Sequence, residues 1–352
     1  MIYYSYLFLI VFLSINHEKY KNIKNLEIAV FFLLFILIGF RFRTGGDYGP
    51  IILYFDFVTK PDQTLAVPYF HQLYKFVAYF SANILKLNVF GQNIILGFIF
   101  TYLLYFFLRQ FKNIYLSLVI SFPVIIMIYG FGSVRQGISI VLFLSVFSLN
   151  SYFKQALTLM IGVLFHATSA IYIIINFAGD IFTKGKLVMM ISLVFILIMG
   201  IILFDDFLLY YKYYITQDSY ISKGFIARNA VTFLCAITYC VIFIHNKKLI
   251  IKKFQVPFFI ISIITLVVYP IGIFSSTAAD RVMAYLLPLQ IVVLNLIYES
   301  ANKKYKQHLN IFICTFYTLM FTIWIFFSDN AHAWVYEIFF FPTKFFYQVS
   351  PI

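Results

Sequence analysis

Charged residues are scarce in this chain, and their scarcity sets its class. Of the 352 residues, 11% are charged and 63% are hydrophobic. A soluble domain carries about 25% charged residues, so this composition excludes a soluble globular protein. We predict an all-α polytopic integral membrane protein in which residues 1–352 form a single membrane domain. The sequence contains no internal repeat, low-complexity tract or separate soluble domain.

Cysteine is also scarce, and its positions exclude two kinds of site. The three cysteines, Cys235, Cys240 and Cys314, all lie within apolar segments and lack a paired spacing. We expect them to pack as small core residues and not to form disulfides or bind metal. Outside the apolar segments the nearest approach to a metal-binding carboxylate pair is Asp205-Asp206. We therefore expect neither a metal nor another cofactor.

Acidic residues are half as numerous as basic ones, which gives a formal net charge of +13. Most of the excess comes from lysines in the loops between apolar segments: Lys19, Lys21, Lys24, Lys184, Lys186, Lys247, Lys248, Lys252, Lys253, Lys303, Lys304 and Lys306. The positive-inside rule makes these loops cytoplasmic. Their charge orients the protein and meets the anionic lipid of the bilayer, so it does not indicate binding of nucleic acid.

Apolar segments recur along the chain at the length of a helical span, which needs about 20 residues. They cover residues 2–15, 26–40, 91–108, 114–130, 134–149, 187–204, 226–244, 256–274, 281–298 and 309–327. The interval 154–179 is read as two crossings hinged at Phe165-His166-Ala167, or as one crossing plus a re-entrant helix. A single crossing would export the nine lysines in the loops between 184 and 306. The total is about 10 to 12 spans, with 12 preferred and both termini outside.

Three outer segments are long enough to have structure of their own. Residues 41–90 form an outer loop, residues 205–225 a tyrosine-rich outer loop, and residues 328–352 an aromatic outer tail. Within the first loop one helical face collects the apolar residues Tyr69, Leu73, Phe76, Val77, Phe80, Ile84 and Leu85. This spacing predicts an amphipathic helix lying along the membrane interface.

Arginine is distributed against the topology rule. Only Arg109 lies among the cytoplasmic lysines, whereas the same threading places Arg41, Arg43, Arg135, Arg228 and Arg281 at the outer face. Arginine binds carboxylate and phosphate through a planar fork of N–H groups. The distribution predicts a site for anions outside the cytoplasm.

Two polar clusters at this face combine arginine with glycine. The first is RFRTGGDY at residues 41–48, in which the glycines permit close backbone approach to an anion. A helix C-cap with snorkelling arginines is the structural alternative. The second is GFGSVRQG at residues 130–137, where Arg135 opens a helix against the local dipole. A structural salt bridge is the alternative for that arginine.

Two further clusters contain the titratable residues. FHATS at residues 165–169 places His166 at the inferred hinge, either as a packed, hydrogen-bonded residue or as a functional one. SSTAADR at residues 275–281 opens the predicted span 281–298. There Asp280 is expected to cap the helix and to pair with Arg281.

Together the four clusters resemble the EpsG-like branch of the Wzy-type polysaccharide polymerases of bacterial envelopes. The resemblance rests on FRFRTGGDY after the second span, SVRQGISI, FHATS and AADRVMAY, in that order. It departs in the Thr-Gly-Gly-Asp run and in Gly137, which puts the sugar preference in question. The resemblance implies a GT-C-like, metal-independent glycosyltransferase of the bacterial cytoplasmic membrane with its active site on the outer face. Donor and acceptor would be undecaprenyl-diphosphate-linked oligosaccharides, joined into O-antigen, capsule or exopolysaccharide, with a chain-length regulator as a further candidate partner.

The residues suit that chemistry. Arginines in a dry pocket stabilise the charge that develops on a departing diphosphate. We assign diphosphate and sugar binding to Arg41, Arg43, Gly45, Gly46, Tyr48, Arg135, Gln136, Arg281 and Tyr285. The attacking hydroxyl needs a proton acceptor within about 3 Å. His166 is the first candidate for this base, followed by Asp47 and Asp280.

Three other functions use similar residues. A flippase of lipid-linked oligosaccharide should place its charges at mid-span depth, often in two related halves. Here the charges gather at one end of the helices, which disfavours transport. A ligase that moves finished glycan from the same lipid carrier, and a membrane acyltransferase acting on envelope sugars, remain as enzymatic alternatives.

Overall fold

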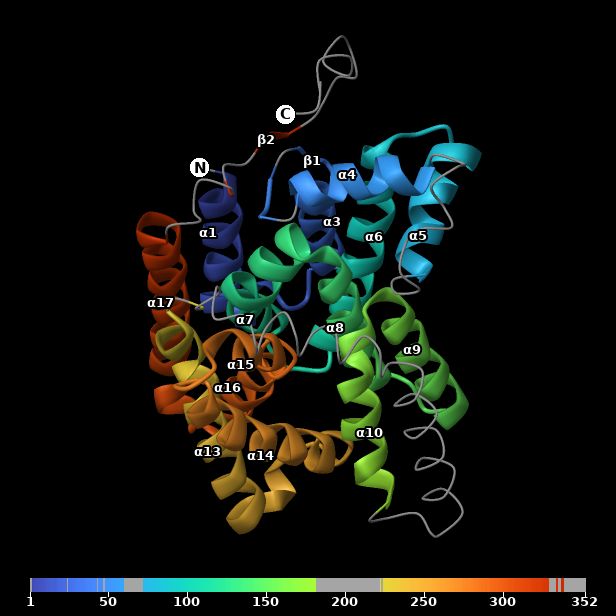
Figure 1. Ribbon diagram of the computed structural model, residues 1–352. Coiled ribbons are helices and arrows are strands. Elements are labelled where there is room, and N and C mark those ends of the chain that lie inside the picture. The colour runs from blue at the N-terminus through green and yellow to red at the C-terminus, as the bar shows by residue number, and fades with distance from the viewer. Residues whose placement is uncertain are drawn as a thin grey trace.

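The computed structural model of the chain is built almost entirely of helices (Figure 1). It describes residues 2–23, 25–42, 44–46, 48–59, 72–181, 222, 224–328, 334 and 337–338. The predicted span 187–204, most of the predicted loop 205–225, and Arg43 and Asp47 lie outside the described residues.

The described helices follow one another in this order: α1 (Ile2–Ile15), α2 (His17–Tyr20), α3 (Leu26–Gly39), α4 (Tyr48–Thr59), α5 (Gln72–Tyr79), α6 (Val89–Leu108), α7 (Ile114–Ser121), α8 (Val134–Val146), α9 (Tyr152–Phe165), α10 (Ile171–Ile181), α13 (Phe225–Asn246), α14 (Gln255–Ile271), α15 (Ser276–Met283), α16 (Pro288–Ser300) and α17 (Lys303–Phe327). The π-helical segments η2 (Phe80–Ile84) and η3 (Phe122–Gly132) extend α5 and α7. Short 3₁₀ turns are η4 (Ala167–Ala170), η6 (Lys247–Leu249) and η7 (Lys252–Phe254), and two short strands are β1 (Arg41–Phe42) and β2 (Glu337–Ile338).

The chain is an all-α membrane protein. Among the described residues five helical stretches are long and apolar enough to cross a bilayer: Val89–Leu108, Ile114–Gly132, Phe225–Leu249, Lys252–Ile271 and Lys303–Phe327. A sixth is reached if α15 and α16 are counted as one bent span. Shorter apolar helices cover Ile2–Ile15, Leu26–Gly39, Val134–Val146, Tyr152–Phe165 and Ala167–Phe177. The total of about 12 spans stays a prediction.

Two of the predicted membrane-crossing segments contain a break in the helix, one of them predicted and the other not. The break at the hinge Phe165-His166-Ala167 is confirmed, since α9 ends at Phe165 and η4 begins at Ala167. The span predicted for 281–298 is not one continuous helix: the chain forms α15 and α16, which are bent by 54° and pass as a span only together. Pro288 begins α16 and has no N–H to continue the hydrogen bonds of the preceding helix.

Helical structure is present at the place of the predicted amphipathic helix, as α5 and η2, whereas its position along the membrane interface stays a prediction. The buried side chains of α5 are Tyr74, Val77 and Ala78, whereas Phe76 and Ile84 are exposed. Exposed aromatic and aliphatic groups of this size suit contact with lipid rather than water.

The core is centred on α7 and η3, whose residues are almost all buried. Polar side chains also join helices inside it. Ser14 of α1 donates to Asn310 of α17 at 2.9 Å, and the Asn113 amide before α7 donates to the Ser14 carbonyl at 3.1 Å. Such interhelical hydrogen bonds stabilise helix association in the absence of water.

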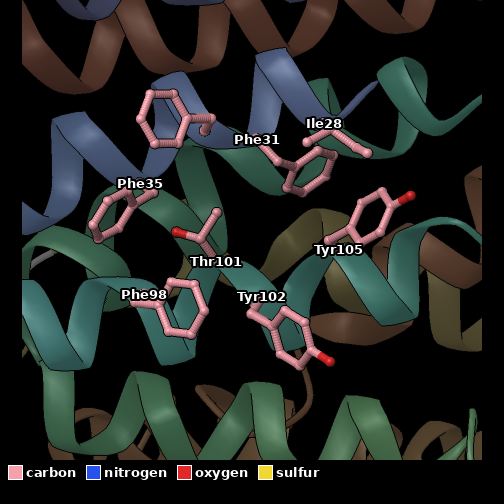
Figure 2. Close-up of a pocket in the computed structure, with 8 residues that line it drawn as sticks. Ile28, Phe31, Phe35, Phe98, Thr101, Tyr102 and Tyr105 are labelled. Carbon is pink, nitrogen blue, oxygen red and sulfur yellow. The ribbon is translucent and has the colours of Figure 1, made fainter. Parts of the chain in front are cut away.

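Two glycines set the distance between α3 and α6. A Cβ added at Gly97 would lie 2.8 Å from the Gly39 Cα, so the backbones touch at this point. Further along the pair, aromatic side chains line a pocket of about 290 Å³, with Thr101 at its wall (Figure 2). The contact joins the last residue of α3 to the middle of α6, and α4 crosses the nearby end of the bundle in Figure 1.

We predict that Gly97→Ala destabilises the protein, because the added methyl group has no space against the Gly39 backbone. Overpacking of this kind costs about 1–3 kcal/mol, which should lower the midpoint of thermal unfolding by several degrees. Gly162→Ala in α9 is the control, since its Cβ would have no neighbour nearer than 3.7 Å. Equal midpoints for the two variants in detergent would contradict the close contact of α3 with α6.

Candidate active site

The first two predicted clusters lie against each other. Gly45 has a φ of +102°, in the left-handed region that favours glycine. A Cβ at Gly45 would lie 2.2 Å from the Phe131 carbonyl oxygen and 3.1 Å from the Gly132 Cα. The turn at 44–46 therefore packs on the turn at 131–132 only because no side chain intervenes. At Gly46, by contrast, a Cβ would have no neighbour within 4 Å, so this part of the backbone faces open space.

Part of the C-terminal tail packs on the same place. β2 pairs with β1 in antiparallel register, so that Arg41 lies opposite Ile338 and Phe42 opposite Glu337. The Trp334 ring covers Gly132, where an added Cβ would come within 2.6 Å of it. The described tail residues thus contact both the first and the second cluster.

Arg41 is enclosed by these contacts. Its side chain is 1% exposed, and its Nη1 donates to the carbonyls of Gly130 at 2.8 Å and Ile38 at 3.3 Å. A buried guanidinium that bonds carbonyls at the C-terminal ends of two helical segments satisfies groups that the helices leave unpaired. This geometry favours the helix-cap alternative for Arg41 over the predicted role in diphosphate binding. Tyr48, at the start of α4, is likewise buried.

The third and fourth clusters meet through His166. Its Nδ1 lies 2.7 Å from the Thr168 hydroxyl and 3.0 Å from the Tyr285 hydroxyl, and the two hydroxyls also bond each other. Tyr285 is buried, His166 is half-buried and Thr168 is exposed. Because two hydroxyl groups converge on Nδ1, this nitrogen suits the acceptor role of a neutral imidazole whose proton is on Nε2. The three groups form a connected path for a proton from the surface to the imidazole.

Two tyrosines that the sequence prediction missed lie near these groups, one beside Tyr285 and one near Asp280. Tyr172 of α10 donates from its hydroxyl to the Tyr285 carbonyl at 2.8 Å, and its ring stacks on Phe143 of α8 with centroids 3.8 Å apart. Tyr129 of η3 is buried and lies within electrostatic range of Asp280, Arg228 and Arg281. The only sequence signal for Tyr129 is its place directly before the Gly130-Phe131-Gly132 turn.

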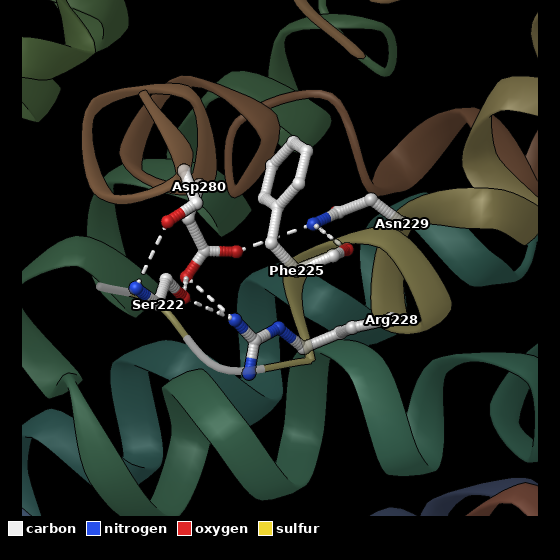
Figure 3. Close-up of polar contacts among 6 residues, drawn as sticks. Ser222, Phe225, Arg228, Asn229 and Asp280 are labelled. Carbon is white, nitrogen blue, oxygen red and sulfur yellow. Dashed lines mark hydrogen bonds and ion pairs between the residues drawn. The ribbon is translucent and has the colours of Figure 1, made fainter. Parts of the chain in front are cut away.

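Asp280 lies at the centre of a polar network between α13 and α15 (Figure 3). Its Oδ2 accepts from the Arg228 guanidinium at 2.8 Å and from the Ser222 hydroxyl at 3.1 Å. Its Oδ1 accepts from the Asn229 amide at 3.2 Å. With both oxygens engaged by donors, the carboxylate is held as an acceptor, which favours a structural role over that of a base.

This network corrects two predictions. Asp280 does not cap a helix that starts at 281, because it lies inside α15. Nor does it pair with Arg281: its ion-pair partner is Arg228, which lies in the first turn of α13. The two residues approach because the start of α13 packs against α15.

The other predicted binding residues differ in how deeply they are buried. Arg135, in the first turn of α8, is half-buried, and its guanidinium carbon lies 5.6 Å from the centre of the Tyr74 ring of α5. Gln136 beside it is buried. Arg281 is exposed on α15. Arg135 and Arg281, like Arg228 in its ion pair with Asp280, are therefore described arginines at this end with some exposure to solvent.

The second and third clusters are linked by helix packing as well. The Ser139 hydroxyl of α8 donates to the Gly162 carbonyl of α9 at 2.8 Å, which fixes the helix that leads to His166. At the start of α8, a Cβ on Gly137 would lie 2.3 Å from the Tyr129 carbonyl oxygen. Gly137 thus meets a steric requirement of this chain.

Within the part of the chain that the structure describes, no three His, Cys, Asp or Glu side chains are grouped to hold a metal ion. That the chemistry uses neither metal nor cofactor stays a prediction. The arrangement provides a proton path at His166 and accessible guanidinium groups at Arg135 and Arg281, which are elements of acid–base and anion-binding chemistry.

Comparison with known proteins gives one family. The family model described as the EpsG family matches residues 24–345, a range that includes all four clusters. No curated protein and no solved structure matches the chain.

We predict that Arg228 and Asp280 are energetically coupled. Arg228→Gln and Asp280→Asn should each lower the thermal midpoint, and the double variant should fall little further, which gives a coupling of about 1 kcal/mol for this partly exposed pair. The matched cycle of Asp280→Asn with Arg281→Gln should give a smaller coupling. A larger coupling to Arg281 would restore the pairing predicted from the sequence.

Proposed function

The chain belongs to the EpsG family, and from this premise we propose that it joins undecaprenyl-diphosphate-linked oligosaccharide repeat units into a surface polysaccharide. Membership gives it a polymerase-like role in polysaccharide biosynthesis and the general character of a membrane glycosyltransferase. The proposed reaction takes place at the outer face of the bacterial cytoplasmic membrane, and its product is an O-antigen, capsule or exopolysaccharide.

One observation carries the proposal. His166 and Tyr285, which are 119 positions apart, lie 3.0 Å apart through Nδ1 and the hydroxyl, close to the α15 segment that presents Arg281. A base and a cation for a phosphate are thus held by neighbouring segments. Glycosyl transfer from a lipid diphosphate requires both, because a proton leaves the acceptor while negative charge grows on the leaving group.

In the proposed reaction an acceptor hydroxyl attacks the anomeric carbon of the donor. The bond from that carbon to the diphosphate oxygen breaks, and its electron pair leaves with the lipid diphosphate. The acceptor proton passes to His166 Nδ1, directly or through the hydroxyl of Thr168 or Tyr285. Direct displacement inverts the configuration at the anomeric carbon.

Arg135 and Arg281 bind the leaving diphosphate in this scheme. Arg43, which lies outside the described residues, is assigned the same role. A guanidinium keeps its charge at any physiological pH and offers two parallel N–H groups to phosphate oxygens. The Asp280–Arg228 ion pair holds α15 on α13 and so fixes the helix that carries Arg281. Arg41 takes no direct part in this scheme because it is bonded inside the bundle.

We predict that Arg135→Ala and Arg281→Ala leave the protein in the membrane but shorten the surface glycan. The loss of one charged hydrogen bond to phosphate is worth about 1.5–3 kcal/mol, or roughly 10- to 100-fold in the rate of chain growth. Arg109→Ala is the control. Arg109 follows the C-terminal end of α6, the end away from the candidate active site, and its guanidinium lies over the Tyr105 ring. Glycan length on gels, normalised to the amount of protein, is the measurement.

A deletion strain separates this function from its rivals. Loss of a polymerase leaves single repeat units attached to the envelope acceptor. Loss of all surface glycan, with lipid-linked units retained on the cytoplasmic side, indicates a flippase and contradicts the proposal. Polymer of normal length that stays on its lipid carrier indicates a ligase.

A further inference from the structure

A cavity with a partly polar lining lies at the far ends of helices that carry the candidate active site. Helix α8 has Arg135 in its first turn and ends at Val146, and α9 runs from Tyr152 to Phe165, the residue before His166. Helix α13 has Arg228 in its first turn and ends at Asn246. The cavity has a volume of about 840 Å³ and lies among the ends of α8 and α9, the segment 247–257 and the middle of α10. In Figure 1, α14 extends toward α10 in this region.

Basic side chains line one side of the cavity. Lys247, Lys252 and Lys253 all contribute to it, and within the described part of the chain none of them forms an ion pair. Lys247 and Lys253 lie over the rings of Phe243 and Phe254, and no carboxylate among the described side chains forms an ion pair with them. Three such charges around one cavity favour an anionic ligand.

The backbone that carries these lysines is held in place. The Gln255 amide donates to the carbonyls of Lys247 and Ile250, both at 3.1 Å. The Tyr239 hydroxyl donates to the Phe254 carbonyl at 2.8 Å. The lysines therefore start from a fixed loop, which lowers the entropy lost when they close on a ligand.

A buried donor points to the same ligand. Asn176 of α10 lines the cavity and is only 8% exposed, and its Nδ2 is buried without a hydrogen-bond partner in the described structure. A buried amide in this state destabilises the protein unless a ligand supplies the acceptor. A phosphate oxygen among the lysines would satisfy it.

The surroundings of the cavity favour a lipid over a soluble anion. Apolar residues also line it, among them Phe147 and Val256. Next to it Phe153 is 76% exposed and Leu249 is 50% exposed, as expected for side chains that enter the membrane interface beside lysines. The cavity thus offers polar groups to a headgroup and apolar groups to the start of an acyl chain.

We propose that this cavity binds the phosphate headgroup of an anionic phospholipid from the leaflet on the lysine side of the membrane. The lysines pair with the phosphate, and the Asn176 amide donates to one of its oxygens. Such a site is separate from the one for the lipid-linked sugar, because it lies at the other ends of α8, α9 and α13. It does not depend on the proposed polymerase activity.

The charge of the cavity is tested with the purified full-length protein in detergent micelles containing phosphatidylglycerol or phosphatidylcholine. Native mass spectrometry gives the affinity for each lipid. The wild type should prefer phosphatidylglycerol, and Lys252→Gln with Lys253→Gln should weaken that binding at least tenfold, as expected for two charges near a phosphate. The control, Lys303→Gln with Lys304→Gln, should change it less than twofold. Equal losses in the two double variants would overturn the site in favour of general surface charge.

Asn176→Leu provides a second measurement, which separates a lipid-binding role of Asn176 from a purely structural one. In lipid-free detergent this variant should unfold at a higher temperature than the wild type, because a buried amide without a partner is removed. Its gain in stability on adding phosphatidylglycerol should nevertheless fall below that of the wild type. An unchanged lipid-dependent gain would remove Asn176 from the site. Inorganic phosphate at millimolar concentration should not displace the lipid; displacement would identify a site for free phosphate and overturn the lipid assignment.

Discussion

Close contact between backbones is the constraint on which the rest of this structure depends. Within a bilayer, apolar surface gains little by leaving lipid for protein, so helices associate through tight packing and interhelical hydrogen bonds. In this chain the tight points are glycines: Gly97 against Gly39, Gly137 against Tyr129 and Gly45 against Phe131. The last two contacts are also the ones that bring the arginine-containing turns to the η3 helix. The same packing therefore stabilises the bundle and assembles the site.

The charges at this end of the bundle divide into two kinds. Arg41, which is buried, and the partly exposed Arg228–Asp280 pair connect helices that are distant in sequence. Arg135 and Arg281 lie where a ligand has some access. In a water-poor site a positioned cation stabilises developing negative charge far better than it would in water. Arg41 and the Arg228–Asp280 pair stabilise the scaffold. Arg135, Arg281 and the imidazole of His166 carry the proposed chemistry.

The sequence was sufficient for features that depend on local residues. The membrane class, the hinge at His166 and the four clusters follow from apolar segments and short polar runs. Pairing between distant residues was not predictable: Arg228 and Asp280 are 52 positions apart, and their contact depends on how α13 packs on α15. Arg41 shows the same limit, since an arginine at a helix end has the same sequence context whether it reaches a ligand or another helix's carbonyls. The bend before α16 could have been found from Pro288.

The most direct test of glycosyl transfer at the His166–Tyr285 cluster is chain growth by the purified protein in liposomes, supplied with lipid-diphosphate-linked repeat units. The wild type should give a ladder of products and release one lipid diphosphate for each bond formed. His166→Ala should abolish the ladder and Tyr285→Phe should shorten it. Tyr239→Phe, which loses a buried hydroxyl at the other end of the bundle, should leave it unchanged. A normal ladder from His166→Ala, or transport of repeat units without chain growth, would contradict the assignment.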